Sequence, residues 1–253
     1  MREPAKRAVI VEAARAHAFD LYLSALLAPR AVLDDLIVLA AFEGELDRIP
    51  VSVSEPMLAE IRLQWWRDAV EGFASGIASG NPIADALAGV VSRAGIEPAD
   101  LIGSIDARSP VETEAEALGV PDVHRQRRLA TDAAAMRRAA RVLGCRALSA
   151  EDAAFLDAAG LAVADVRALV TNASRESDAT ARVAEVEAAL SGAARAQLDR
   201  AAALLGNRSR ALRLSALPLA LVRPYLQAWE NGKCCTPLQR VWRLWWLARV
   251  GRL

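Results

Sequence analysis

Two carboxylates, Glu43 and Asp47, stand four residues apart in a segment rich in helix-forming residues. Side chains at i and i+4 lie on one face of a helix, so this pair could hold a divalent cation. Mg²⁺ is the natural candidate because it prefers carboxylate oxygens, yet two carboxylates are few for a magnesium site in water. The simpler interpretation, which we favour, is the solvated acidic end of a helix with Arg48 beside Asp47.

A second set of chemically capable side chains lies in E-I-R-L-Q-W-W-R-D, residues 60–68. Arg62 and Arg67 could line a pocket mouth and bind a diphosphate or another anionic head group, because guanidinium groups pair well with phosphate oxygens. Trp65 and Trp66 point about 100° apart on a helix, so both are buried only if the helix is packed on two sides. The alternative, which we favour, is a core helix in which one arginine pairs with a nearby carboxylate.

The C-terminal segment 237–253 is both aromatic and basic, and it contains no acidic residue. A helix of this kind can lie at a membrane interface, with indole rings at head-group depth and arginines on anionic lipid. Its apolar residues can equally close a helical core. The side chains that carry both interpretations are Trp242, Trp245, Trp246, Arg240, Arg243, Arg249 and Arg252.

Nearly every segment of the chain has the composition and periodicity of a helix, and strand-like alternation is scarce. Pro50 is predicted to end the second helix, and Ser54 and Ser149 are predicted to cap the helices that follow them. The sequence predicts an all-α, single-domain helical bundle over residues 1–253. The predicted helices span residues 5–27, 30–47, 54–75, 82–95, 98–108, 122–143, 149–170, 183–206, 209–230 and 237 onward.

The formal charge of the chain is zero, but its two halves differ. Residues 1–120 hold 10 basic and 19 acidic side chains, and the remainder holds 21 basic and 12 acidic ones. Such asymmetry can orient a protein at an anionic surface. We favour the simpler interpretation that the halves are complementary parts of one globule.

Three cysteines, Cys145, Cys234 and Cys235, form neither a disulfide framework nor a zinc motif, which favours a reducing compartment. The N-terminus is unlike a secretory signal, and no apolar run is long enough to span a bilayer. We therefore expect a cytoplasmic protein. The arginines do not alternate with aromatics as in a nucleic-acid-binding module, so no nucleic-acid partner is expected.

The stretch from Phe19 to Phe73 resembles the squalene/phytoene synthase family. It contains F-D-L-Y-L-S-A-L-L-A-P-R, A-A-F-E-G-E-L-D-R-I and S-E-P-M-L-A-E-I-R-L-Q-W-W-R-D-A-V. It is most similar to a divergent branch that includes relatives of mitochondrial complex I assembly factors. The resemblance implies the isoprenoid (terpenoid) synthase fold and favours packing of the last helix in the core.

The resemblance also implies two aspartate-rich magnesium motifs on facing helices. The first should begin at Asp47, but the chain reads D-R-I-P-V there. The second should lie within residues 160–172, where Asp165 stands alone. By the same resemblance Arg30 lies near a substrate diphosphate. The residues expected to line a pocket are Tyr22, Phe42, Trp65, Trp66 and Gly160.

Two functional interpretations follow from the resemblance, and a purely structural helical scaffold with a collapsed cavity is a third alternative. We favour a pseudoenzyme that does not perform head-to-head synthesis and instead binds a prenyl chain or lipid, or assists assembly of a respiratory complex, peripherally on an inner membrane. The alternative is a Mg²⁺-dependent prenyltransferase that condenses two farnesyl or geranylgeranyl diphosphates, with Mg²⁺ held by Glu43, Asp47 and either Asp165 or Asp178.

Overall fold

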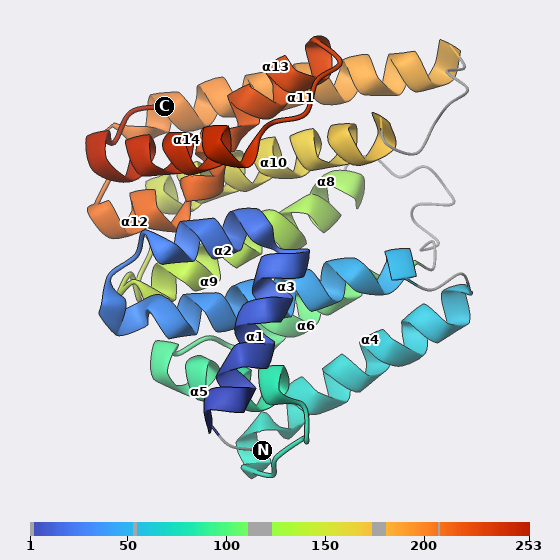
Figure 1. Cartoon of the computed structure of the whole chain (residues 1–253), viewed down its shortest axis with the longest axis vertical. Coiled ribbons are helices and arrows are strands. Elements are labelled where there is room, and N and C mark those ends of the chain that lie inside the picture. The colour runs from blue at the N-terminus through green and yellow to red at the C-terminus, as the bar shows by residue number, and fades with distance from the viewer. Residues whose placement is uncertain (1–2, 53–54, 111–122, 174–180, 207) are drawn as a thin grey trace.

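The computed structural model describes residues 3–52, 55–110, 123–173, 181–206 and 208–253, and every regular element within these ranges is helical. Figure 1 shows α10, α11, α13 and α14 stacked at one end of the molecule, and α1, α4 and α5 at the other. Helices α2, α3 and α9 lie between these groups. The prediction of an all-α bundle is confirmed.

The N-terminal part of the chain builds one hydrophobic cluster, centred on α3. The elements of this part are α1 (Glu3–His17), α2 (Phe19–Leu26), η1 (Arg30–Val32), α3 (Leu33–Ser52), α4 (Pro56–Glu71), η2 (Gly72–Ser75), α5 (Pro82–Ala94) and α6 (Pro98–Asp106).

The C-terminal part builds a second cluster around α10, and Leu143 packs against both clusters. The elements of this part are α8 (Val123–Arg128), η3 (Leu129–Ala133), α9 (Ala134–Val142), α10 (Ala150–Ala173), α11 (Ala181–Leu205), α12 (Arg210–Ser215), η4 (Leu217–Leu221), α13 (Val222–Glu230) and α14 (Pro237–Val250). None of the helices in the described ranges combines the length and apolarity that a bilayer crossing needs.

The predicted helix over residues 5–27 is wrong, because the chain turns at Ala18 (φ −138°, ψ 50°) between α1 and α2. The turn rests on α3 at Gly44, where an added Cβ would lie 2.9 Å from the Cβ of His17. Tertiary packing therefore divides a segment whose composition is helical throughout.

Pro50 does not end the second helix as predicted, since α3 continues to Ser52. Proline in the last turn removes only one helical hydrogen bond, and its fixed φ suits a helix. Ile49, which is buried, anchors this turn in the core. The predicted cap at Ser54 lies outside the described residues.

The predicted helix over residues 209–230 is also divided, into α12, η4 and α13. Pro218 and Pro224 lie in this stretch and lack the N–H that a continuous helix needs. The predicted cap at Ser149 is confirmed: its Oγ accepts from the Asp152 N–H at 3.1 Å, and its own N–H donates back to Asp152 at 3.2 Å.

Ion pairs join the acidic N-terminal half to the basic C-terminal half. Glu43 pairs with Arg138, and Asp47 pairs with Arg167 at 3.0 Å. This supports the interpretation that the halves are complementary parts of one globule.

Candidate functional site

Glu43, near the middle of α3, is a buried carboxylate held by two arginines. Its Oε2 accepts from Arg108 at 2.7 Å, and its Oε1 accepts from Arg138. Arg108 also donates to the Ser104 carbonyl at 3.0 Å, and Arg138 donates to the Ser104 hydroxyl at 2.9 Å. With Glu43 and Arg138 respectively 3% and 1% exposed, this end of the pair is core rather than a solvated helix end.

Asp47 lies one turn further along α3 and is likewise bound on both oxygens. Oδ1 accepts from Arg108 Nε at 2.7 Å, and Oδ2 accepts from Arg167 at 3.0 Å. Burial would raise the pKa of Asp47, but the charges of Arg108 and Arg167 outweigh burial and lower this pKa below its ordinary value. Arg167 also pairs with Asp132 at 2.9 Å. Burial raises the pKa of Asp132 against the attraction of Arg167.

The interlocked arginines and carboxylates form what we call the ion-pair network: Glu43, Asp47, Asp132, Arg108, Arg138 and Arg167. Its three carboxylates and three guanidinium groups balance in charge. These side chains come from α3, the turn after α6, η3, α9 and α10, so the network crosses the boundary between the two hydrophobic clusters.

A close approach of two helical segments positions part of the network. Residues Leu129–Ala133 form a π-helical turn, and α10 packs against it at Gly160. A Cβ at Gly160 would lie 2.4 Å from the Cα of Ala133, which no side chain tolerates. The small residue therefore lets α10 bring Arg167 to Asp132.

A cavity of about 400 Å³ opens beside Asp47 and Arg167. The apolar part of its wall comes from α10, η4 and the α1–α2 junction. The lining residues are Ala16, His17, Ala18, Phe19, Asp20, Leu21, Asp47, Val163, Val166, Arg167, Val170, Pro218, Leu221, Tyr225 and Arg240.

A second polar group in the cavity wall is built on Asp20, Tyr225 and Arg240. The Tyr225 hydroxyl donates to Asp20 Oδ2 at 2.6 Å, and Arg240 approaches Oδ1 at 3.4 Å. Burial and then the charge of Asp20 raise the pKa of Tyr225. The Arg240 guanidinium lies over the rings of Tyr225 and Phe19, 5.3 and 5.7 Å from their centroids. Its buried Nε has no hydrogen-bond partner among the described residues.

The residues predicted to line a pocket lie elsewhere. Phe42 is fully buried and packs edge-to-face on Trp66, with ring centroids 5.3 Å apart. Trp66 is buried, whereas Trp65 is 39% exposed, so α4 is packed on one side only. Tyr22 packs against the N-terminal cluster. Gly160 serves the contact with Ala133.

The arginines predicted to bind an anion are also away from this cavity. Arg30 begins the exposed η1, and Arg62 is exposed on α4. Arg67 is bound to Asp106 at 2.6 Å and to Glu60 at 2.7 Å. Of the residues singled out to bind a metal or an anion, Glu43 and Asp47 share the partner Arg108, and Asp47 also reaches the cavity.

The isolated aspartate of the expected second motif, Asp165, faces the core of the bundle. It is 2% exposed and forms an ion pair with Arg128. Burial raises the pKa of Asp165 against the attraction of Arg128. Asp178 lies outside the described residues.

Two comparisons with known proteins found a likeness, one to a protein family and one to a solved structure. Residues 14–110 match the family model described as squalene/phytoene synthase. Among solved structures, the chain is similar to the squalene synthase HpnC from Alicyclobacillus acidocaldarius, with 17% sequence identity and a TM-score of 0.64 over 90% of this chain and 94% of that chain. The search of curated proteins found no match.

The fold is thus the all-α isoprenoid synthase fold that the sequence predicts, since a likeness at this identity speaks for the fold alone. The family-model match covers residues 14–110, and the fold match extends over nearly the whole chain.

This family typically depends on Mg²⁺, and the carboxylates of α3 do not fit such a metal in this arrangement. Each of the four oxygens of Glu43 and Asp47 already accepts a hydrogen bond from a guanidinium group. Within the described ranges, no group of three or more His, Cys, Asp or Glu side chains is arranged to hold a metal ion. In this arrangement arginine side chains neutralise both carboxylates.

Sequence reasoning missed most of this network. Arg108, Arg138 and Asp132 carry no local signal, because their partners are distant in sequence: Arg138 lies 95 residues from Glu43. For Arg167 the sequence does contain a signal. Together with Asp165 it interrupts the apolar run L-A-V-A-D-V-R-A-L-V, and charges in such a run indicate buried pairs.

Proposed function

We propose that this protein binds a prenyl or lipid anion in the 400 Å³ cavity without magnesium, and that it does not join two prenyl diphosphates. One observation carries the proposal: Glu43 and Asp47 of α3 are each bound to arginines on both carboxylate oxygens. A metal would have to bind beside three guanidinium groups or displace them. The first is opposed by charge repulsion, and the second would leave the buried Arg108 and Arg138 without their partners, which is strongly unfavourable.

The cavity wall suits an amphiphile with a negative head. Val163, Val166 and Leu221 offer apolar contact to a chain, whereas Arg167 and Arg240 offer positive charge. Mostly apolar cavities with a few polar groups are the usual form of small-molecule sites. Arg240 is the better candidate for the head group, because its hydrogen bonds to Asp20 and to the Cys235 carbonyl are both long, at 3.4 Å.

The proposal is tested by calorimetric titration of farnesyl diphosphate with Mg²⁺ and with a chelator. We expect the two dissociation constants to agree. Arg240→Gln should weaken binding of farnesyl diphosphate but not of uncharged farnesol. Tight binding that requires Mg²⁺ and is lost in Asp47→Ala would overturn the proposal and restore the Mg²⁺-dependent prenyltransferase.

A pair of matched variants tests the place of binding. Val170 lines the cavity and is 37% exposed, so Val170→Trp should fill the cavity mouth without straining the core. Val186 on α11 is 47% exposed and does not line the cavity, which makes Val186→Trp the control. Binding that is unchanged in Val170→Trp, or absent in the wild type, contradicts the proposed site.

Assembly of a respiratory complex, which the resemblance to the divergent branch implies, stays a prediction. It is compatible with a bound lipid and with a protein that performs no synthesis. Co-purification of respiratory subunits with the tagged chain would support it.

A further inference from the structure

The outward face of α14 is apolar, although this helix lies at the surface. Its inward face is anchored by Leu244 and Leu247, which are 0% and 1% exposed. On the opposite face Trp242, Trp245 and Trp246 are 56%, 40% and 39% exposed. A surface helix ordinarily turns polar residues outward, whereas α14 has apolar side chains on both its inward and its outward face.

The exposed aromatic rings form one continuous surface. Trp242 stacks on Trp245 with centroids 5.4 Å apart, and it lies 6.0 Å from Trp246. Leu238 is 78% exposed and stands one turn before Trp242, so it extends this surface toward the start of the helix. We call Leu238, Val241, Trp242, Trp245 and Trp246 the tryptophan face.

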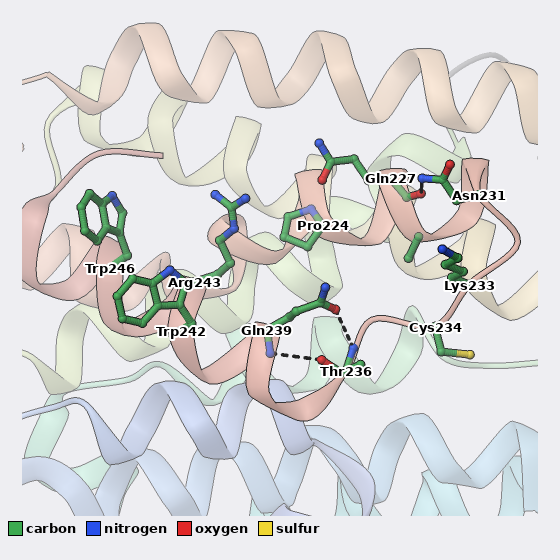
Figure 2. A pocket seen from close by; sticks show the side chains of 11 residues that line it. Pro224, Gln227, Asn231, Lys233, Cys234, Thr236, Gln239, Trp242, Arg243 and Trp246 are labelled. Atoms are coloured by element: carbon green, nitrogen blue, oxygen red, sulfur yellow. Dashed lines mark hydrogen bonds between the residues drawn. The ribbon is translucent and has the colours of Figure 1, made fainter.

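A groove of about 650 Å³ borders the tryptophan face, between α13 and α14. Figure 2 shows Trp242 and Trp246 at one end of this groove, Arg243 beside them and Lys233 at the other end. Thr236 and Gln239 lie on the groove floor, and their polar groups are used in the cap of α14: Thr236 Oγ1 accepts from the Gln239 N–H at 3.3 Å. The charged side chains that line the groove, Lys233 and Arg243, are both cationic, and its aromatic side chains are Trp242 and Trp246.

The charged residues of the C-terminal segment have a single sign. Residues 237–253 contain no Asp or Glu. Arg249 and Arg252 are exposed beside the tryptophan face, and Lys233 is exposed across the groove. Cationic side chains around exposed indoles are complementary to a surface that combines negative charge with an apolar interior.

We propose that the tryptophan face docks on an anionic phospholipid bilayer, with α14 lying in the plane of the interface. Indole rings partition to head-group depth, and basic side chains add electrostatic attraction to anionic lipid. A bilayer fits these observations better than a protein partner, because uniform positive charge needs a uniformly negative counterpart. This inference does not depend on the ligand proposed for the cavity.

The experiment is co-sedimentation of the whole protein with phosphatidylcholine vesicles that contain or lack phosphatidylglycerol. We expect partitioning to require phosphatidylglycerol and to weaken as salt is added, since surface attraction is screened over a Debye length. Arg249→Glu should weaken partitioning about 25-fold, because it changes two units of charge, each worth about fivefold. The triple variant Trp242→Ser, Trp245→Ser, Trp246→Ser should abolish partitioning.

A second exposed apolar stripe provides the matched control. Met57, Leu58 and Ile61 on α4 are 74%, 48% and 60% exposed, and acidic side chains flank them. Their triple replacement by serine should leave partitioning unchanged. Equal loss in both triple variants would mean non-specific adsorption. The proposal would be overturned by such loss, by equal binding to vesicles without phosphatidylglycerol, or by no binding at all. The last result would favour a protein partner for the tryptophan face.

Discussion

The arginines of the ion-pair network are structural counterions, and their removal should be costly. Arg138→Met leaves one oxygen of the buried Glu43 without its partner, and loss of one member of a buried pair costs about 3–5 kcal/mol. Urea titration measures this as a fall in the free energy of unfolding. The control is Arg7→Met: the Arg7–Asp34 pair is exposed, so the change should stay below about 1 kcal/mol. Equal effects in the two variants would contradict a special role for the buried network.

Asp47 gives the network a predictable pH dependence. In the folded protein the pKa of Asp47 lies below its ordinary value of 3.8, so the ionised carboxylate stabilises the fold above pH 3.8. This contribution is lost as pH falls below 3.8 through the folded pKa. Asp47→Asn should therefore be less stable than the wild type at neutral pH, and the difference should disappear in strong acid. A difference that is constant across the pH range would be inconsistent with this sign.

At the scale of elements, the contact between α10 and η3 rests on one glycine. Gly160→Ala forces a Cβ to within 2.4 Å of the Ala133 Cα, and overpacking of this kind typically costs about 1–3 kcal/mol or more. Gly192 lies in α11 with nothing within 4 Å of an added Cβ, so Gly192→Ala should stabilise by about 0.5–1 kcal/mol. Thermal unfolding measures both changes. The same sign in the two variants would show that helix propensity, rather than the close approach, governs position 160.

At the scale of the whole molecule, the ion-pair network should make the two hydrophobic clusters unfold together. Trp66 lies in the N-terminal cluster and Trp229 packs against the C-terminal one. In a variant that retains one of these tryptophans, the urea midpoint by fluorescence should coincide with the midpoint by circular dichroism, as a two-state transition requires. Midpoints that differ within one variant would show that the clusters are independent units.

Features set by local sequence were predictable, and features set by distant contacts were not. Pro82, Pro98 and Pro237 each open a helix where the sequence places one, because proline suits the first helical turn. The turn at Ala18 depends on packing against Gly44, and Glu43 finds Arg138 across 95 residues. The sequence could therefore locate the acidic pair on α3 but could not name its counterions.

The π-helical turn Leu129–Ala133 carries one residue more than an α-helical turn of the same span needs. That surplus residue sets the phase of α9 relative to α8. Arg128, before the turn, reaches Asp165, and Arg138, after it, reaches Glu43 on a different helix. Deletion of one residue within the turn would restore regular α-helix and rotate everything on one side of it by about 100°. Only one of the two contacts could then form. The length of this turn therefore fixes which way the side chains of α8 and α9 face in the core.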